Sequence, residues 1–267
     1  MMTIPRIIHQ TWKTGKLPNA FREFRDSWLR CHPDWEYRFY DDAACRRLVA
    51  NFFPQLLTIY DCCPHPVQRA DIFRYLAVAL NGGVYADMDM ECLRNLEPVL
   101  DGEKAVFSVE DRLSPRRTRQ LKHRYSERIA NFIFAAEPGH PIFQKIIEAL
   151  QQLSSRTDLA GEILDTTGPG MLTDVVQENR DRLGLTILPR ICLAPPSRGY
   201  PNCFPFNLHM YARHHFFGTW KGSCRPANAS AGWLDPRNWH PGELWYKVPP
   251  SPIWKSDFFF WLKKKAR

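Results

Sequence analysis

The chain has 267 residues, 44% of them hydrophobic and 13% aromatic, which is enough to build one large globular domain. Its formal net charge of +8 suits anionic partners, such as nucleic acid, a membrane surface or a phosphorylated substrate, without choosing among them. Eight cysteines without CxxC spacing argue against a disulfide scaffold. The start lacks the apolar core of a signal peptide and no run approaches 18 apolar residues, so the sequence predicts a reduced, cytoplasmic protein.

The first quarter of the chain predicts alternating strands and helices. The segment IPRIIHQTW is a candidate first strand, and a helix capped by Asn19 follows it with apolar residues at helical spacing. DWEYRFYDD alternates with period two, which predicts a half-buried strand. Helical patterns follow over residues 42–52 and 54–62.

The rest of the chain continues this alternation as far as Pro195. A helix over 66–80 ends at two glycines, and the strands NGGVYADMDMEC and KAVFSV come after it. Residues 112–128 are strongly basic without an apolar stripe, so a mobile loop is expected. Then come the strand ANFIFAAE, a helix over 140–153, a Gly-Pro-Gly turn that opens another helix, and one or two strands in LTILPRICLAP. The pattern predicts an α/β sheet.

The segment NGGVYADMDMEC places acidic residues where a strand is expected. Alternation puts Tyr85, Asp87, Asp89 and Glu91 on one face, with Asp87 and Asp89 roughly 6.6 Å apart. A divalent cation would relieve the repulsion between the two carboxylates, and pyrophosphate oxygens could complete its shell. A solvated strand without a metal is the alternative. Glu91 is expected to lie past such a site and to meet solvent.

The preceding helix carries Asp71 and Arg74 at a spacing of three residues, which places them on one face. They can form a simple surface ion pair. Alternatively, Asp71 binds hydroxyl groups of a sugar or ribose while the Arg74 guanidinium binds phosphate or sugar oxygens. The two glycines after the helix would allow a tight turn into the acidic strand.

These segments carry a family resemblance. IPRIIHQTWK, HPDWEYRFYDD, RADIFRYLAVALNGGVYADMDME and HHFFGTWKG occur in the order and spacing seen in glycosyltransferase family 32, the DXD-type sugar transferases. The chain resembles this family over residues 4–222, with yeast Golgi α-mannosyltransferases and, distantly, glucosylating clostridial toxins among the relatives. The resemblance implies an α/β fold of the GT-A type, which is a Rossmann-like mixed sheet flanked by helices. It also implies a divalent metal cofactor, with Mn²⁺ favoured over Mg²⁺.

The resemblance also assigns site residues. Asp87 and Asp89 match the DXD pair, which with Arg74 makes the catalytic set, and His215 is expected to complete the metal site. His214 is adjacent, and the sequence leaves open which of the two histidines is the ligand. The positions that match donor-binding residues are Gln10, Thr11, Trp12, Asp71, Arg74, Tyr85, Asn131 and Trp220.

The function implied is metal-dependent, retaining transfer of a hexose from a UDP- or GDP-linked donor to a glycan or lipid-linked acceptor. A bacterial enzyme of surface polysaccharide synthesis is expected. The alternatives are an effector that glycosylates a protein, a metal-dependent phosphoryl hydrolase or nuclease, and a basic binding module. Nucleic acid is not an expected partner, because outside the tail the basic segments lack interleaved aromatics.

The chain end is expected to be separate from the transferase domain. Residues 1–222 are assigned to that domain and 223–267 to an aromatic and basic extension that wraps it or docks at a membrane. Within the extension, FFFWLKKKAR at 258–267 combines aromatics with lysines, as a segment at an anionic lipid surface does. The alternative is a terminal element packed on the domain. Peripheral association with the inner face of a membrane would suit a lipid-linked acceptor.

Overall fold

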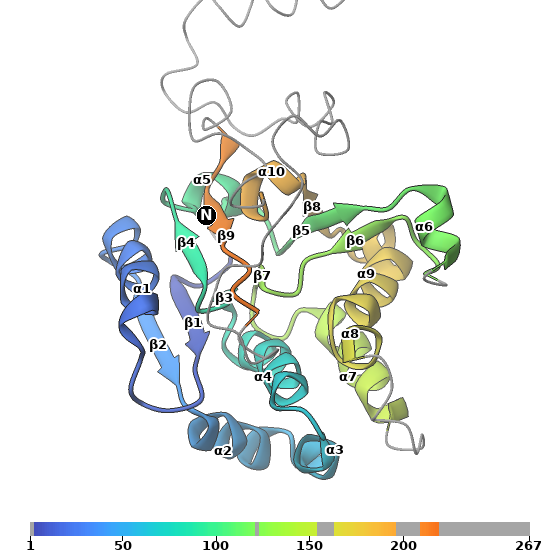
Figure 1. Ribbon diagram of the computed structural model, residues 1–267, viewed down its shortest axis with the longest axis horizontal. Helices are drawn as coiled ribbons and strands as arrows, with labels where there is room; N and C mark the ends of the chain where they lie inside the picture. The colour runs from blue at the N-terminus through green and yellow to red at the C-terminus, as the bar shows by residue number, and fades with distance from the viewer. Residues whose placement is uncertain (1–2, 121–122, 154–162, 196–208, 219–267) are drawn as a thin grey trace, which may run out of the picture.

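The central sheet mixes parallel and antiparallel strands in the order β2-β1-β3-β7-β5-β6, with β8 paired to β5 (Figure 1). The computed structural model describes residues 3–120, 123–153, 163–195 and 209–218. The strands of this sheet are β1 (Ile7–Thr11), β2 (Glu36–Tyr40), β3 (Gly83–Ala86), β5 (Ala105–Arg112), β6 (Glu127–Ile129), β7 (Ile133–Ala136) and β8 (Thr186–Leu188). A second, two-stranded sheet joins β4 (Met90–Cys92) to β9 (Ala212–His214).

Two layers cover the sheet. One face carries α2 (Asp42–Phe52), α3 (Leu57–Cys62), α4 (Pro66–Asn81), α7 (Pro141–Leu153) and α9 (Pro169–Leu183), with a 3₁₀ turn at Pro54–Leu56 and the short α8 (Ile163–Thr166) beside them. The other face carries α1 (Asn19–Cys31), α5 (Glu97–Leu100), α10 (Arg190–Leu193) and the β4–β9 pair. The short helix α6 (Pro115–Gln120) follows β5.

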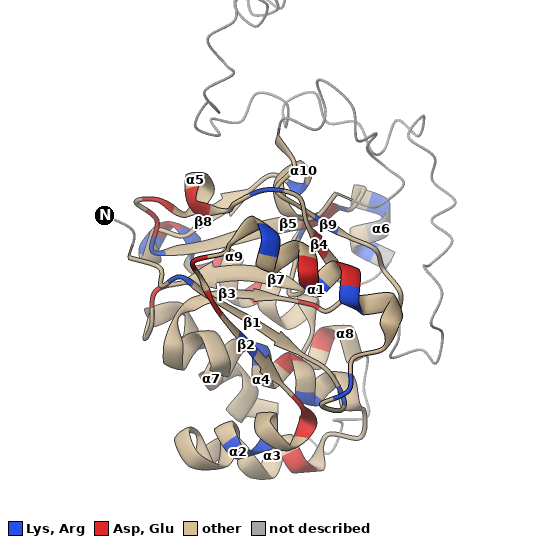
Figure 2. Ribbon diagram, turned by 90° about the vertical axis from the view of Figure 1, so that its left-hand side faces the viewer, with Lys and Arg blue, Asp and Glu red and all other residues tan. Residues whose placement is uncertain are grey.

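Alternation along the inner strands divides the core between the two faces. In β3, Val84 and Ala86 pack into one hydrophobic cluster and Tyr85 into the other. The strands β3 and β7 carry no charged residue, which is why both are tan in Figure 2. Both are fully buried, as expected for strands covered on two faces.

The directions of the strands decide which chain segments lie together at each edge of the sheet. The strands β1 and β3 pair in parallel, while β3 and β5 both pair antiparallel to β7. Therefore β1, β3 and β5 run the same way, and their carboxyl ends lie at one edge. The residues that follow these ends are brought together although they are distant in sequence.

Several expected elements differ from the structure. The acidic strand breaks after Ala86, and the Met90 N–H donates to the Asp87 carbonyl (3.0 Å), so Asp87 to Asp89 form a turn. The basic segment expected as a loop contains α6 and β6, and the second strand expected near 190 is the short helix α10. Asn19 is the first residue of α1, but its side chain is not the cap.

The remaining expectations concern membrane spans, cysteines and the C-terminal part of the chain, and the structure describes only some of the residues involved. Within the described ranges no helix is both long and apolar enough to span a bilayer. The described cysteines, from Cys31 to Cys192, are free thiols. The expected domain boundary at residue 222, the extension 223–267, the tail 258–267 and Trp220 all lie outside the described residues.

Candidate active site

A cavity of about 360 Å³ opens at the edge where β1 and β3 end. This is where α/β folds bind nucleotide ligands, because loops and helix ends converge beyond the carboxyl ends of parallel strands. The walls come from the ends of β1 and β3 and the segments after them, from α1, α2 and α4, and from β9. They are Thr11, Trp12, Lys13, Phe21, Asp42, His65, Pro66, Val67, Ala70, Arg74, Tyr85, Asp87, Met88, Asp89 and His214.

The turn between α4 and β3 depends on its two glycines. Gly82 and Gly83 have φ values of +63° and +96°, in the left-handed region that L side chains rarely adopt. A Cβ on Gly83 would lie 2.6 Å from the Ile7 carbonyl oxygen. The imidazole of His9 holds this turn from the β1 side, with Nε2 2.9 Å from the Gly82 carbonyl oxygen. The glycines therefore let β3 enter the sheet directly beside β1.

Asp71 and Arg74 form a buried network, so the surface ion-pair alternative is wrong. They are 3% and 4% exposed on α4, which is covered by neighbours through its middle turns. The Asp71 carboxylate accepts hydrogen bonds from Asn131 Nδ2 (2.9 Å) and Thr167 Oγ1 (3.1 Å). Arg74 donates from Nη1 to the Asn131 carbonyl (2.9 Å). The network fixes Arg74 before any ligand enters.

The guanidinium of Arg74 lies between two carboxylates. Its Nη2 is 3.2 Å from Asp71 Oδ1 and 3.3 Å from Asp87 Oδ1, and its plane lies over the Tyr85 ring at 5.0 Å. Burial raises the pKa of Asp71 to about 6, although Arg74 opposes that shift. Burial also raises the pKa of Asp87, again against Arg74, and the Asp89 charge adds to the rise. Arg74 is therefore the cation that stabilises the ionised forms of Asp71 and Asp87.

Two neighbours position Asp87. Burial raises the pKa of Tyr85 well above its usual value, so its hydroxyl stays protonated. This hydroxyl donates a hydrogen bond to Asp87 Oδ1 (2.7 Å). Gln10 donates from Nε2 to the Asp87 carbonyl (3.1 Å) and accepts from the Tyr37 hydroxyl (2.9 Å). The side chain of Gln10 is completely buried and does not line the cavity. It acts on the site by holding the turn.

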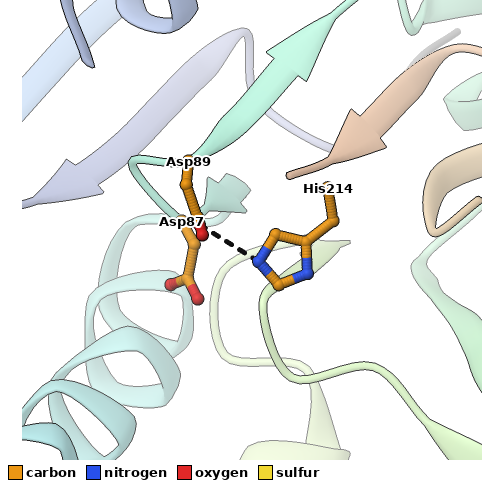
Figure 3. A group of neighbouring side chains, drawn as sticks. All are labelled: Asp87, Asp89 and His214. Atoms are coloured by element: carbon orange, nitrogen blue, oxygen red, sulfur yellow. Dashed lines mark hydrogen bonds and ion pairs between the residues drawn. The ribbon is translucent and has the colours of Figure 1, made fainter. Parts of the chain in front are cut away.

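Asp89 is held by His214 at the end of β9 and by the segment that follows this strand. Its Oδ1 lies 3.1 Å from His214 Nε2 (Figure 3). Its Oδ2 accepts the Phe217 backbone N–H at 2.9 Å. Burial alone would raise the pKa of Asp89, but His214 and the Phe217 N–H outweigh it and lower the pKa. Likewise burial opposes a charge on His214, yet the Asp89 carboxylate raises its pKa. The two groups stabilise each other in the charged form.

The structure corrects the expectation for His215. In the β4–β9 register His214 is opposite Met90 and Arg213 is opposite Glu91. His214 points to Asp87 and Asp89, whereas His215 Nε2 pairs with Glu91 Oε2 at 2.9 Å and its ring stacks on Phe24 at 4.4 Å. Glu91 is therefore not simply solvated. Adjacent residues point different ways, so only one histidine can reach the DXD turn.

The side chains of Asp87, Asp89 and His214 could hold a divalent cation. One ligand atom from each lies within 4.8 Å of the other two (Figure 3). Three carboxylates, from Asp71, Asp87 and Asp89, outnumber the Arg74 and His214 cations with which they pair, so a net negative charge remains at this end of the cavity. Two oxygens and an imidazole are a ligand set that divalent metals accept in proteins. The residues present fit the metal that the DXD pattern implies.

Aromatic side chains also line the cavity. Trp12 contacts Phe21 at 4.6 Å between ring centroids, and Phe21 in turn contacts Phe217 at 5.2 Å. Both Trp12 and Phe21 line the cavity. Thr11 also lines it, but its hydroxyl donates to the Tyr40 carbonyl (2.9 Å) and so ties β1 to β2. Trp12 thus lies where an aromatic ring of a ligand could stack.

Some functional contacts had no sequence signal. The Phe217 N–H that binds Asp89 is a backbone group, and any residue except proline supplies one. The hydrogen bond from the Thr167 hydroxyl to Asp71 joins residues 96 positions apart. Gln10 was expected at the donor and instead supports the turn. Asn131 was expected near the sugar, and it is buried against Asp71 and Arg74.

Comparisons with known proteins find similar sequences and a similar fold. Residues 18–106 match the family model described as "Glycosyltransferase sugar-binding region containing DXD motif". Inositol phosphoceramide mannosyltransferase 3 of Schizosaccharomyces pombe is 34% identical over 221 residues, which cover 82% of this chain and 55% of that protein. Mannosyl phosphorylinositol ceramide synthase SUR1 of Saccharomyces cerevisiae is 28% identical, covering 82% and 51%.

The chain spans about half the length of these curated relatives. Both are fungal and do not support the expectation of a bacterial member. Among solved structures, the PaToxG glycosyltransferase aligns with a TM-score of 0.50 at 18% identity, covering 66% of this chain and 70% of that one. At that identity the likeness concerns the fold alone, and it confirms the expected GT-A type.

Proposed function

We propose that this chain, which carries the DXD sugar-binding region of the glycosyltransferases on a GT-A type fold, transfers a hexose from a nucleotide-sugar donor to a hydroxyl group of an acceptor. The names of its relatives favour mannose as the hexose and a phosphoinositol lipid headgroup or a related glycan as the acceptor. The observation that carries the proposal is the buried Asp71–Arg74–Asp87 network at the cavity edge.

The chain's own residues supply binding and charge. Trp12 would stack on the nucleotide base, and Arg74 would face the diphosphate, whose charge increases as the sugar leaves. A divalent cation held by Asp87, Asp89 and His214, with Mn²⁺ proposed before Mg²⁺, would supply further positive charge to the diphosphate. Asp71 holds Arg74 and Asn131 in place.

In the proposed reaction the bond from the anomeric carbon to the diphosphate oxygen breaks, and the acceptor oxygen bonds to that carbon. The hydroxyl proton passes to the released nucleoside diphosphate. Retention of configuration is proposed from the family resemblance. The acceptor then has to approach from the face of the sugar on which the diphosphate lies.

Donor hydrolysis without acceptor tests the proposal. UDP- and GDP-linked hexoses are incubated with the protein and Mn²⁺, and the released nucleotide is measured. One of these donors is expected to be cleaved, and Asp87→Asn and Asp89→Asn are each expected to lower that rate at least about 100-fold because charge stabilisation is lost. Asp181→Asn, at a fully exposed side chain on α9, is the matched control and should keep the wild-type rate.

Full hydrolysis by either variant, or by the wild type in excess chelator, would contradict the metal-dependent mechanism. Cleavage of nucleic acid or a phosphate ester without nucleotide-sugar cleavage would favour the hydrolase alternative. Thermal unfolding of each variant shows whether a lost rate reflects a lost fold.

A further inference from the structure

A second group of charged side chains lies at the same edge of the sheet, away from the donor cavity. Because β5 runs in the direction of β3, its carboxyl end lies at the edge where the DXD turn lies. Glu110 is in the irregular step of the β5–β6 pairing, between the Val109–Ile129 and Asp111–Arg128 partners. Such bulges redirect a side chain and are frequent beside active sites. Glu110 therefore occupies a position that regular pairing would not give it.

The group consists of Glu110, Arg128 and Arg190, and we call it the β5 charged group. Arg128 Nε lies 3.4 Å from Glu110 Oε2, and Arg190 Nη1 lies 3.4 Å from Asp111 Oδ1. The side chains of Glu110, Arg128 and Arg190 are 21%, 14% and 14% exposed, so all three are largely removed from water but still reachable.

The hydrogen-bonding capacity of this group is not filled. Glu110 Oε2, Arg128 Nε and Arg190 Nε are buried atoms with no hydrogen-bond partner among the described residues. Buried charged groups in proteins are normally hydrogen-bonded, because desolvation without a partner is costly. Glu110 Oε2 and Arg128 Nε face each other at 3.4 Å without forming a hydrogen bond, and Arg190 Nε has no hydrogen-bond partner among the described residues, so the group keeps an acceptor and donors for a ligand.

The β5 charged group lies near His214 and outside the donor cavity. Glu110 is close enough to His214 for each charge to act on the other, and Phe132, just before β7, stacks on the same imidazole at 4.1 Å. The donor cavity includes His214 but none of the three members of the group. In the view of Figure 1, β9, which carries His214, lies between β4 and the β5–β6 hairpin.

We infer that Glu110, Arg128 and Arg190 form the acceptor subsite and bind a polyol headgroup that carries a phosphate. The carboxylate of Glu110 suits a hydroxyl donor, while the two guanidiniums suit phosphate oxygens, which they bind in fixed planar geometry. From this subsite the acceptor hydroxyl would reach the sugar past His214, which lines the donor cavity. This inference rests on the proposed transferase function and names the substrate class of its second site.

The test measures transfer to two acceptors that share this chemistry. Inositol phosphoceramide in vesicles provides the lipid-borne headgroup and inositol 1-phosphate the free one, with the donor identified by hydrolysis. In Glu110→Gln and Arg190→Gln the ratio of transfer to donor hydrolysis is expected to fall at least tenfold with either acceptor. That fall corresponds to about 1.4 kcal/mol of lost acceptor interaction. Glu148→Gln, at an exposed side chain on α7, is the matched control and should keep the wild-type ratio.

A binding measurement separates this inference from the proposed function. Calorimetry with inositol 1-phosphate needs no turnover, and both site variants are expected to weaken its binding at least tenfold. Unchanged binding and an unchanged ratio in both variants would overturn the acceptor subsite even if the wild type is an active transferase. If the wild type cleaves no nucleotide sugar, the proposed function fails, while the binding result still decides for or against the subsite. Thermal unfolding identifies a variant that does not fold, and the other variant then carries the test.

Discussion

Arg74→Met tests whether one guanidinium holds the buried carboxylates of the site together. The replacement keeps an unbranched side chain of similar length but removes the positive charge. Asp71 and Asp87, whose oxygens lie 3.2 and 3.3 Å from Nη2, lose their shared cation, and the Asn131 carbonyl loses its donor at 2.9 Å. Removing one partner of a buried ion pair costs about 3–5 kcal/mol, because the remaining charge is left without compensation.

This cost predicts a large change in thermal stability. A domain of this size loses about 2–4 °C in Tm for each kcal/mol, so Arg74→Met is expected to unfold about 6–20 °C below the wild type. Arg74→Lys is the matched variant, because it keeps the charge but not the planar fork of donors. It is expected to lose about 1–3 kcal/mol. Urea unfolding in the presence of a chelator, so that no metal replaces the lost cation, gives both free energies of unfolding.

The pH dependence of the stability loss in Arg74→Met shows whether the unpaired carboxylates cause it. Burial already raises the folded-state pKa of Asp71 to about 6, above the ordinary value of 3.8, and without Arg74 this pKa rises further. The folded state then binds more protons than the unfolded state above about pH 4, so stability falls as pH rises toward the folded-state pKa. The loss in Arg74→Met is therefore expected to be larger at pH 8 than at pH 5. A loss below about 1 kcal/mol, or one equal at the two pH values, would refute this explanation.

Two further predictions concern the support of the site. Burial lowers the pKa of His9 to about 4 from 6.5, so the unfolded state binds more protons between these values and stability rises with pH across that window. In His9→Gln that rise is expected to be smaller by up to about 1.4 kcal/mol per pH unit, measured by urea unfolding from pH 4 to 7; parallel curves for the two proteins would contradict it. Gly83→Ala places a Cβ 2.6 Å from the Ile7 carbonyl oxygen at a φ of +96°, and it is expected to cost at least about 2 kcal/mol more than Gly102→Ala. Gly102 also has a positive φ (+77°) but open space around it, so equal losses in the two variants would show that the contact with Ile7 is not limiting.

The longer elements could be predicted because their periodicity is local. The helices expected over 66–80 and 140–153 are α4 and α7, within one residue at each end. The helices α6 and α10 were not predicted, because six and four residues are too few to show an apolar period of 3.6. Pro115 at the start of α6 was the one local signal available for it.

The residue types of the site were also readable from the sequence. Asp87, Asp89, Asp71 and Arg74 stand out by spacing, and the structure brings all four together at one end of the cavity. The geometry assumed for Asp87 and Asp89 was wrong, since they belong to a turn and not to an extended strand. Spacing identifies which residues are close in the chain but not the backbone path between them.

Only the tertiary structure decided which partners these residues have. His214 rather than His215 reaches Asp89 because β9 pairs with β4 in one particular register, across 125 residues of chain. The sequence determined the alternation of elements and the acidic turn, since both follow from neighbours along the chain. The supporting role of Gln10 and the placing of Glu110 beside His214 follow from strand order and direction, which bring distant segments to one edge of the sheet. Contacts of that kind depend on how the whole chain packs, and no local pattern encodes them.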